Sequence, residues 1–326
     1  MQPIQKIMAP TDFSACSSIA VANALALANR LDAELHLFHV SRLLETALEV
    51  TNGFAVLADV LQEPDRAITV HMNRLMEKSS GSANVTVKRI QMRALSVPSA
   101  ILRYARTQHI DLVVMGSHGH RGIKRWLLGS TAEETIRLAP CPVMVCPHAG
   151  VDLVPGRMER ILVPIDFSDH ALAALDCGAS FAGAFGGRLL LLHVLPKQSG
   201  SRESEVREAE EKLRSVAVKA GRGIPVEIHV VCGHPGREIL SFAQEKHCHL
   251  VCMSHLGRTG MVERLLGSTS EYVTRSAKAP VLVAADNTRA RLEMAENGGT
   301  SSRDAVASYR VAPQMNERDT DPGGRP

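Results

Sequence analysis

The chain has 326 residues, of which 45% are apolar, and a formal net charge of +3. This length fits two domains with ordinary cores, and the near-neutral charge gives no reason to expect a nucleic-acid or anionic-membrane surface. No apolar run approaches the roughly 18 residues that a membrane helix needs, and a strand pattern begins almost at the first residue, so neither a membrane span nor a signal peptide is expected.

The first half alternates short β-branched runs with longer helical patterns. The predicted strands lie at residues 6–10, 34–40, 85–91, 111–116 and 142–146. Between them, helices are predicted at residues 15–31, 65–80, 97–108 and 130–138. The segment 41–63 stays apolar without strand alternation, which leaves a loop and a short helix open.

The second half has the same alternation. Its predicted strands lie at residues 160–164, 188–194, 226–231, 249–254 and 280–284, and its predicted helices at residues 169–185, 202–220, 236–246 and 268–275. The sequence therefore predicts a first domain at 1–147, a Pro- and Gly-containing linker at 148–159, and a second domain at 160–286. Residues 287–326 have almost no large apolar side chains, so a disordered tail is expected there.

The two halves repeat each other. The segment KIMAPTDFS at residues 6–14 recurs as RILVPIDFS at residues 160–168. A glycine-containing loop after the fourth strand also recurs, and it ends in Leu-Leu-Gly-Ser-Thr in both copies. Asp166 follows Asp12 by 154 residues, whereas Gly267 follows Gly129 by 138, so the second copy is about sixteen residues shorter in its middle. A repeat of this length is a duplicated domain.

Several predicted strands are apolar on both faces, for example residues 112–115 and 189–192. Such strands belong in a parallel sheet that helices cover on both sides. The predicted fold class is therefore α/β, with two repeated doubly wound (Rossmann-like) domains. Each domain is expected to have a five-stranded parallel sheet with helices on both faces.

The loop after the fourth strand has the composition of an anion site. Gly116 and Gly119 form Gly-x2-Gly, nine residues separate Gly119 from Gly129, and Ser130 and Thr131 then open a helix. Glycines let backbone N–H groups approach a phosphate, and the positive end of the helix dipole favours an anion. This arrangement needs no P-loop lysine, and a Walker A pattern is missing.

The spacing Gly-x2-Gly-x9-Gly-Ser/Thr resembles the nucleotide signature of the universal stress protein family. Together with the Pro-x-Asp after the first strand, the match extends over nearly all of residues 1–286, so the chain is similar to a tandem universal stress protein. The resemblance implies a cytoplasmic stress-response protein that binds ATP, with or without Mg²⁺, and hydrolyses it slowly at most.

The resemblance also implies the nucleotide contacts. In the first domain these are Pro10, Asp12, Val40, Met115, Gly116, Gly119, Gly129, Ser130 and Thr131. In the second domain they are Pro164, Asp166, Val194, Met253, Gly257, Gly267, Ser268 and Thr269.

The second copy departs from the signature at its first glycine, where Ser254 stands in place of Gly116. A Cβ at this position is expected to crowd a phosphate or to stiffen a turn that needs a positive φ. His118 is likewise replaced by Leu256. We therefore expect nucleotide in the first domain before the second.

Purely structural roles compete with binding. Ser130 and Ser268 each precede a glutamate by three residues, so a capping box alone would explain a serine at each helix start. Asp12 would equally support the start of the first helix, alongside Ser14 as N-cap. His39 and His193 end matching strands and are expected to pack there.

Charged side chains in the first loop leave further alternatives open. His118 and His120 lie within plausible reach of a terminal phosphate as acid or base, but the second copy keeps neither, so no catalytic residue is assigned. The basic side chains of the loop would either screen phosphate charge or be solvated: Arg121, Lys124 and Arg125. The competing functions are a nucleotide-free interaction module and a slow ATPase.

Seven scattered cysteines, an odd number, indicate small buried side chains in a reducing cytoplasm. Two groups lack paired zinc spacing, so no metal site is expected: Cys141, Cys146 and His148, and His247, Cys248, His249, Cys252 and His255. The closing strands, at residues 143–145 and 281–283, are apolar edge strands in this family's sheet. They are expected to join the two domains as a pseudo-dimer, and association of two chains stays open.

Overall fold

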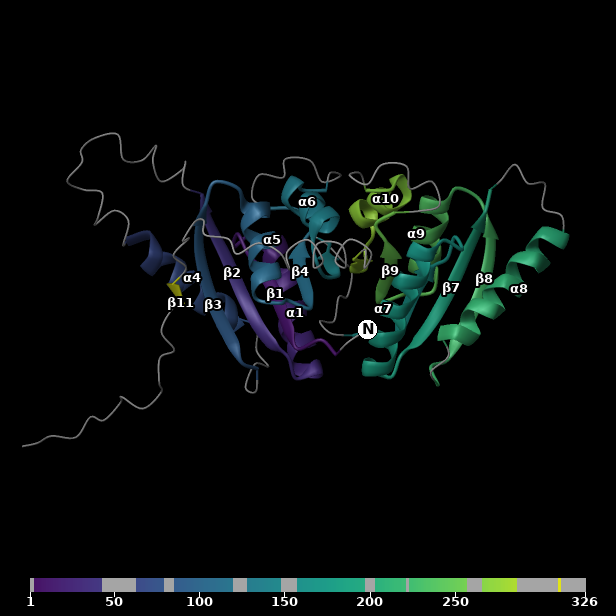
Figure 1. Cartoon of the computed structure of the whole chain (residues 1–326), viewed down its shortest axis with the longest axis horizontal. Coiled ribbons are helices and arrows are strands. Elements are labelled where there is room, and N and C mark those ends of the chain that lie inside the picture. Colours follow the sequence, from purple (N-terminus) through teal and green to yellow (C-terminus); the bar gives the residue numbers. More distant parts are fainter. Residues whose placement is uncertain are drawn as a thin grey trace, which may run out of the picture.

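The computed structural model describes residues 3–42, 63–78, 85–119, 128–147, 157–196, 203–220, 223–256, 266–285 and 310–311. Helices and strands alternate through both halves of this part of the chain (Figure 1). The predictions for the segment 41–63, the linker and the tail fall largely outside the described residues.

The first half follows the predicted order of elements closely. Its strands are β1 (Lys6–Pro10), β2 (Glu34–Arg42), β3 (Val87–Ala94), β4 (Leu112–Gly116) and β5 (Val143–Cys146). Its helices are α1 (Ala15–Leu31), α4 (Glu63–Lys78), α5 (Val97–Thr107) and α6 (Ser130–Leu138).

The second half repeats this order. Its strands are β6 (Arg160–Pro164), β7 (Arg188–Leu195), β8 (Val226–Cys232), β9 (Leu250–Ser254) and β10 (Val281–Ala284). Its helices are α7 (Asp169–Phe185), α8 (Glu203–Ala220), α9 (Pro235–Glu245) and α10 (Ser268–Ser276).

The described strands form one sheet in the order β11-β3-β2-β1-β4-β5-β10-β9-β6-β7-β8. Within each half the five strands are parallel, as predicted. The halves join where β5 pairs antiparallel with β10, which confirms the predicted pairing of the closing strands. A short strand, β11 (Arg310–Val311), pairs antiparallel with β3; the rest of the tail lies outside the described residues.

The core spans both halves. Helices α1, α4, α7 and α8 cover one face of the sheet, and α5, α6, α9 and α10 cover the other. On each face the buried side chains form one cluster that includes residues of both repeats. Across the halves, the Arg30 guanidinium also lies 5.9 Å from the centre of the Phe185 ring. The two repeats therefore share one hydrophobic core around β5 and β10.

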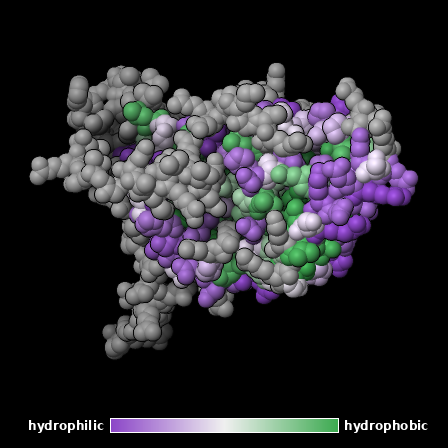
Figure 2. All heavy atoms as spheres, turned by 45° about the vertical axis from the view of Figure 1, so that its right-hand side comes forward, coloured by the Kyte–Doolittle hydropathy of each residue, from purple (hydrophilic) through white to green (hydrophobic). Residues whose placement is uncertain are grey.

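The outer surface of the second half is strongly hydrophilic over α8, on the right of Figure 2. This helix carries i,i+4 ion pairs, including Arg207–Glu203 at 2.6 Å and Lys212–Glu208 at 2.6 Å. Such exposed pairs contribute little to stability, because water screens both charges. They mark α8 as a solvated edge of the molecule. Among the described helices, none is long and apolar enough to cross a membrane.

The cysteines are free, and six of the seven are buried, as predicted. Burial raises the pKa of Cys141 to about 12 and that of Cys177 to about 11, so these thiols stay protonated at neutral pH. The prediction was wrong for Cys232, which is exposed at the end of the outer strand β8. In the described ranges, no group of three or more His, Cys, Asp or Glu side chains is arranged to hold a metal ion.

The first helix of each half begins and ends for the same physical reasons. The hydroxyls of Ser14 and Ser168 accept hydrogen bonds from backbone N–H groups of the first turn, which caps α1 and α7. At the other end, Asp32 and Gly186 occupy the left-handed C-cap, with φ of 52° and 64°. Glycine adopts this conformation without a steric penalty, whereas aspartate does not.

We expect Asp32→Gly to raise the free energy of unfolding by about 0.5–1 kcal/mol, because it places the residue of the second repeat at the same cap. The matched variant is Gly186→Asp, which is expected to lower the free energy by a similar amount. A Cβ at Gly186 has no heavy atom within 4 Å, so only the backbone conformation changes. Urea denaturation of the full chain measures both effects. A destabilised Asp32→Gly variant would contradict this account.

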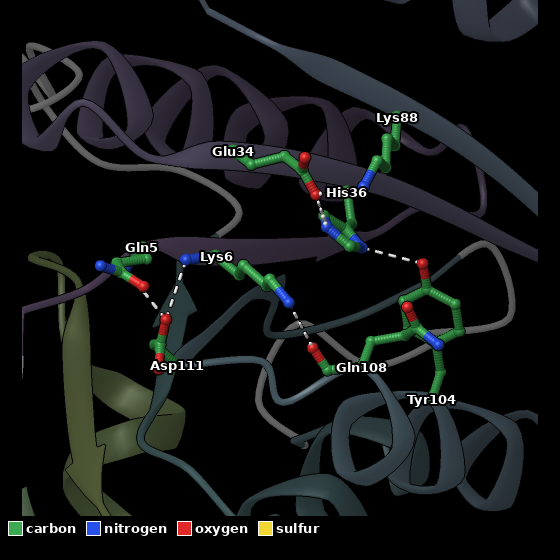
Figure 3. Close-up of polar contacts among 8 residues, drawn as sticks. All are labelled: Gln5, Lys6, Glu34, His36, Lys88, Tyr104, Gln108 and Asp111. Carbon is green, nitrogen blue, oxygen red and sulfur yellow. Dashed lines mark hydrogen bonds and ion pairs between the residues drawn. The ribbon is translucent and has the colours of Figure 1, made fainter.

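A polar network that runs from the core to the surface distinguishes the first half from the second (Figure 3). The His36 ring, which is 1% exposed on β2, accepts a hydrogen bond at Nδ1 from the Tyr104 hydroxyl at 2.8 Å. Its Nε2–H donates to the Glu34 carboxylate, which also pairs with Lys88 at 2.8 Å. The network therefore ties α5 to β2 and β3.

The second half has no such network at the corresponding positions. Leu190 and Phe242 replace the histidine and the tyrosine. The flanking ion pair is kept with its charges exchanged, as Arg188–Glu227 at 3.1 Å. An apolar pair therefore fills the same place in the same fold, which gives a natural replacement for the network.

Acid is expected to destabilise the first half through this network. Burial lowers the pKa of His36 below its ordinary value of 6.5, although the hydrogen bond to Glu34 raises it. Burial by itself raises the pKa of Glu34, but hydrogen bonds from Lys88 and His36 hold it below its ordinary value of 4.5. As the pH falls, both groups bind protons in the unfolded chain before they do so in the folded protein. The network's contribution to the free energy of unfolding is therefore complete above the ordinary pKa values and is lost as the pH falls below them.

The double variant His36→Leu/Tyr104→Phe copies the apolar pair of the second half. We expect its free energy of unfolding to change less than that of the unmodified chain as the pH falls below 6.5. Urea denaturation at a series of pH values measures both slopes. Equal slopes would show that the network does not contribute to the acid sensitivity.

Candidate functional site

The candidate site lies where the strand order of the first half reverses. The chain forms β1, β2 and β3 in one direction and then adds β4 and β5 on the other side of β1. The carboxyl ends of β1 and β4 therefore meet at a topological switch point, where ligands bind in open α/β sheets. The predicted residues of the turn after β1 and of the loop after β4 start at these ends.

Asp12 and Gly119 come together at this point. The Asp12 Oδ2 atom faces the loop, because a Cβ placed on Gly119 would lie 2.5 Å from it. The other carboxylate oxygen, Oδ1, accepts a hydrogen bond from the Ser14 N–H at 3.1 Å. Both interpretations of Asp12 are therefore compatible with its geometry: one oxygen supports the start of α1, and the other lies at the mouth of the loop.

The turn after the first strand is strained in both halves. Phe13 and Phe167 adopt a left-handed backbone, with φ of 65° and 63°, which is rare for a bulky residue. Their rings pack on His39 and His193, with ring centres 4.6 and 4.5 Å apart. The ring contacts hold the turn in this conformation.

His39 and His193 pack at the strand ends, as the sequence predicted. Each ring donates an Nδ1–H to a carbonyl of the turn after the first strand, that of Thr11 at 2.8 Å and that of Ile165 at 2.6 Å. Burial lowers the pKa of His39, although the Thr11 carbonyl and Asp12 raise it. A neutral ring that donates to a carbonyl positions the turn.

Gly116 is needed because β4 packs closely against α1 at this position, and this differs from the reason that the sequence suggested. Its φ lies outside the left-handed region. A Cβ there would lie 2.8 Å from Cys16 Sγ and 3.0 Å from the Cys16 carbonyl carbon, so it would collide with α1 before it met a phosphate. The prediction of a positive φ was therefore wrong for this position, whereas the crowding of a phosphate by a Cβ stays a prediction.

The capping-box interpretation was also wrong. Gly129 and Gly267 are the N-caps, and Ser130 and Ser268 are the first helical residues, without a side-chain cap bond at either described helix. The cap lies one residue earlier because the Glu133 N–H donates to the Gly129 carbonyl at 2.9 Å. The N–H groups at the start of α6 precede this first helical bond and point out of the helix end.

Gly129 closes the loop through its own backbone. Its N–H donates to the Ser117 carbonyl at 2.8 Å, so this amide is already used. A Cβ on Gly129 would lie 3.3 Å from the same carbonyl oxygen, which explains the glycine by close approach. Gly267 makes the equivalent bond to the His255 carbonyl at 2.8 Å. The loop ends are therefore tied together in both halves.

The remaining predicted residues line the same strand ends. In the first half, Met115 is buried beneath the loop and Val40 is half-buried at the end of β2. Pro10 ends β1, Ser130 is exposed, and Thr131 is half-buried. The second-half counterparts have the same placement: Pro164, Asp166, Val194, Met253, Ser268 and Thr269.

Part of the loop falls outside the described residues. It includes the second-half glycine and the basic and histidine side chains of the first loop: Gly257, His120, Arg121, Lys124 and Arg125. His118 is described, and its Nδ1 lies 2.9 Å from the Ser117 hydroxyl. Sequence reasoning missed Ser117, although its replacement by a histidine in an otherwise matching segment was a visible signal.

Comparisons with known proteins identify relatives of both halves. The model of the universal stress protein family matches residues 3–147 and again residues 158–285. The universal stress protein Rv2005c of Mycobacterium tuberculosis is 28% identical over 235 residues, which cover 68% of this chain and 77% of the relative. A universal stress protein of Mycolicibacterium smegmatis is 26% identical over 290 residues, covering 85% and 96%.

A solved structure shares the fold. The crystal structure of a universal stress protein from Archaeoglobus fulgidus superposes with a TM-score of 0.62 at 24% identity. The superposition covers 86% of this chain and 97% of the other. This similarity supports the doubly wound fold of both halves.

Proposed function

Because the chain belongs to the universal stress protein family, with two copies of the domain in tandem, we propose that its first half binds ATP. The site is the switch point between β1 and β4. In this proposal the nucleotide acts as a ligand that sets conformation or partner choice in a cytoplasmic stress response. It is not proposed as a substrate that turns over rapidly.

The convergence of Asp12 with Gly119 carries this proposal. A carboxylate oxygen at the mouth of a glycine loop gives a hydrogen-bond acceptor for a ribose or a base, and glycines without a Cβ let phosphates approach backbone N–H groups. The triphosphate would lie at the start of α6, where the N–H groups of Ser130 and Thr131 and the helix dipole favour an anion. The adenosine part would lie between Asp12 and the end of β2 at Val40.

The residues present also fit a magnesium ion that is carried by the nucleotide. Mg²⁺ keeps several waters and is usually bound through one or two carboxylates together with phosphate oxygens. Asp12 Oδ2 faces the loop, so it can accept a hydrogen bond from the adenosine part and a second one from a water of the ion. The ion would neutralise phosphate charge, and the remaining contacts would come from backbone N–H groups of the loop.

Features of the second half support a different function for it, that of an interaction module that binds no nucleotide. Ser254 replaces the packing glycine, and its hydroxyl donates to the Leu256 carbonyl at 2.6 Å, so the start of this loop is tied to itself. Ile165 replaces Thr11 at the turn after the first strand. We therefore propose one nucleotide per chain, held by the first half.

Direct identification of the ligand tests the proposal. The chain is purified, small molecules are released by denaturation, and their masses are measured. ATP is then titrated calorimetrically with and without Mg²⁺, and phosphate release is followed in the same samples. One ATP per chain with slow or no phosphate release is expected. If nothing co-purifies and no binding is measured, the interaction module is correct, and rapid phosphate release would favour the ATPase.

A further inference from the structure

Three residues form the floor of the glycine loop in the first half: Cys16, Gly116 and Ser117. Ser117, which is 3% exposed, connects the parts that meet there. Its N–H donates to the Cys146 carbonyl at 2.9 Å, at the end of β5, and its own carbonyl accepts the Gly129 N–H at 2.8 Å. The loop floor therefore joins both ends of the loop to the strand that connects the two halves.

Cys16 fills the space beneath this junction. It lies in the first turn of α1 and is 2% exposed. Its Sγ atom lies 3.7 Å from the Ser117 hydroxyl and 3.7 Å from the Cys146 carbonyl oxygen. It also lies 2.8 Å from the position that a Cβ on Gly116 would take. The thiol therefore fixes how closely α1 approaches the loop.

The spacing between α1 and the floor of the loop directly affects the candidate site. Asp12 precedes α1 by three residues, and its carboxylate faces Gly119, which follows Ser117 by two residues. The thiol contact and the carboxylate–loop contact thus join the same two segments. A change in volume at Cys16 would shift one segment relative to the other.

The second half has a different floor. His170 and His255 stand in place of the cysteine and the serine, and their ring centres lie 6.2 Å apart. The second half also has an additional hydrogen bond, from the Ser270 hydroxyl to the Ser254 carbonyl at 2.7 Å. The first half has Ala132 at the position of Ser270 and cannot make this bond. The backbone bond between the loop ends is kept, so the difference lies in the side chains beneath it.

We propose that Cys16 is a positioning residue for the nucleotide. Through its contacts with Ser117 and the Cys146 carbonyl, beside a glycine that leaves room for the thiol, it sets the distance between Asp12 and the glycine loop. This spacing makes the first half the one that selects ATP. The inference rests on the proposed function. It identifies the Cys16 thiol as the group that positions the proposed ATP site.

The test compares two cysteine truncations in the full chain. Cys16→Ala removes the thiol under the loop, and Cys141→Ala is the matched control, a buried thiol in the same half, two residues before β5. ATP affinity is measured by calorimetry and the free energy of unfolding by urea. Cys16→Ala is expected to weaken ATP binding about 10-fold because the site loses its preorganised spacing, whereas Cys141→Ala stays within about twofold. The conservative Cys16→Ser variant is expected to stay within about threefold of the unmodified chain.

The outcomes separate the two proposals. An unmodified chain that binds no ATP overturns both. A chain that binds ATP with equal affinity in the Cys16→Ala and Cys141→Ala variants, or with equal losses in both, overturns the positioning role and leaves ATP binding intact. If Cys16→Ala does not fold, Ser117→Ala decides. It removes the hydroxyl that contacts the thiol and is expected to weaken binding about threefold or more, and unchanged affinity would again overturn the role.

Discussion

Gly119→Val is expected to weaken ATP binding by about 100-fold, the size of losing two charge-assisted hydrogen bonds. A Cβ at this position lies 2.5 Å from Asp12 Oδ2, so the branched side chain has to push the carboxylate out of the site. It also fills the space through which a phosphate would approach the loop backbone. Both contacts that carry the proposed function are lost in one substitution.

The stability of the protein is expected to fall by no more than the one hydrogen bond between Asp12 Oδ1 and the Ser14 N–H. Gly119 is exposed, and its backbone lies outside the left-handed region, so valine meets no core atom and no forbidden φ. The effect should therefore appear in the calorimetric ATP titration and hardly in urea denaturation. A variant that unfolds at much lower urea concentration would point to a structural role for this glycine.

Gly257→Val is the matched control in the second half. It makes the same change at the corresponding glycine, which lies outside the described residues. If the first half holds the nucleotide, this variant keeps one ATP per chain with unchanged affinity. If Gly257→Val abolishes binding and Gly119→Val does not, the assignment of the site to the first half is wrong.

Local sequence signals predicted the helices best. The ranges 15–31 and 169–185 agree with α1 and α7 residue for residue. Each has a serine N-cap before an apolar periodic run, so neighbouring residues alone determine where the helix starts and which face is buried. The pairing of the closing strands was predicted from the family resemblance, since these apolar strands lie at the edge of that family's sheet, where unpaired backbone needs a partner.

Contacts between distant segments could not be predicted from one sequence. The capping-box interpretation of Ser130 failed because a backbone bond from Gly129 to Ser117 moved the cap by one residue. Gly116 was assigned to phosphate access, but its reason lies on α1, 100 positions earlier in the chain, at Cys16. The hydrogen bond between His36 and Tyr104 likewise joins a strand and a helix 68 residues apart.

A fragment of residues 1–147 is expected to dimerise, because it exposes a strand that the full chain buries. All four residues of β5 are buried, and in the full chain Met144 lies opposite Leu282 while Val143 and Val145 lie opposite valines of β10. Without the second half, this apolar edge keeps unpaired backbone groups and exposes core side chains. A second fragment provides the same strand in the antiparallel direction that a two-fold axis requires.

The repeat predicts the register of that dimer. Leu282 corresponds to Met144, so two copies of β5 that pair as β5 and β10 do would place Met144 opposite itself. Met144→Lys in the fragment would then put two like charges face to face within an apolar layer, which opposes pairing. In the full chain the same substitution places one unpaired charge opposite Leu282, at positions that are 0% exposed. It is expected to lower the free energy of unfolding by about 3–5 kcal/mol.

Sedimentation equilibrium of the fragment measures this directly. A dimer at micromolar concentration is expected for residues 1–147, together with a monomer or unfolded chain for the Met144→Lys fragment. The full chain is expected to unfold in a single transition, because the same core clusters contain residues of both repeats. A fragment that stays monomeric, and as resistant to urea as the full chain, would show that each repeat has a self-sufficient core and that the β5–β10 pairing only tethers two independent domains.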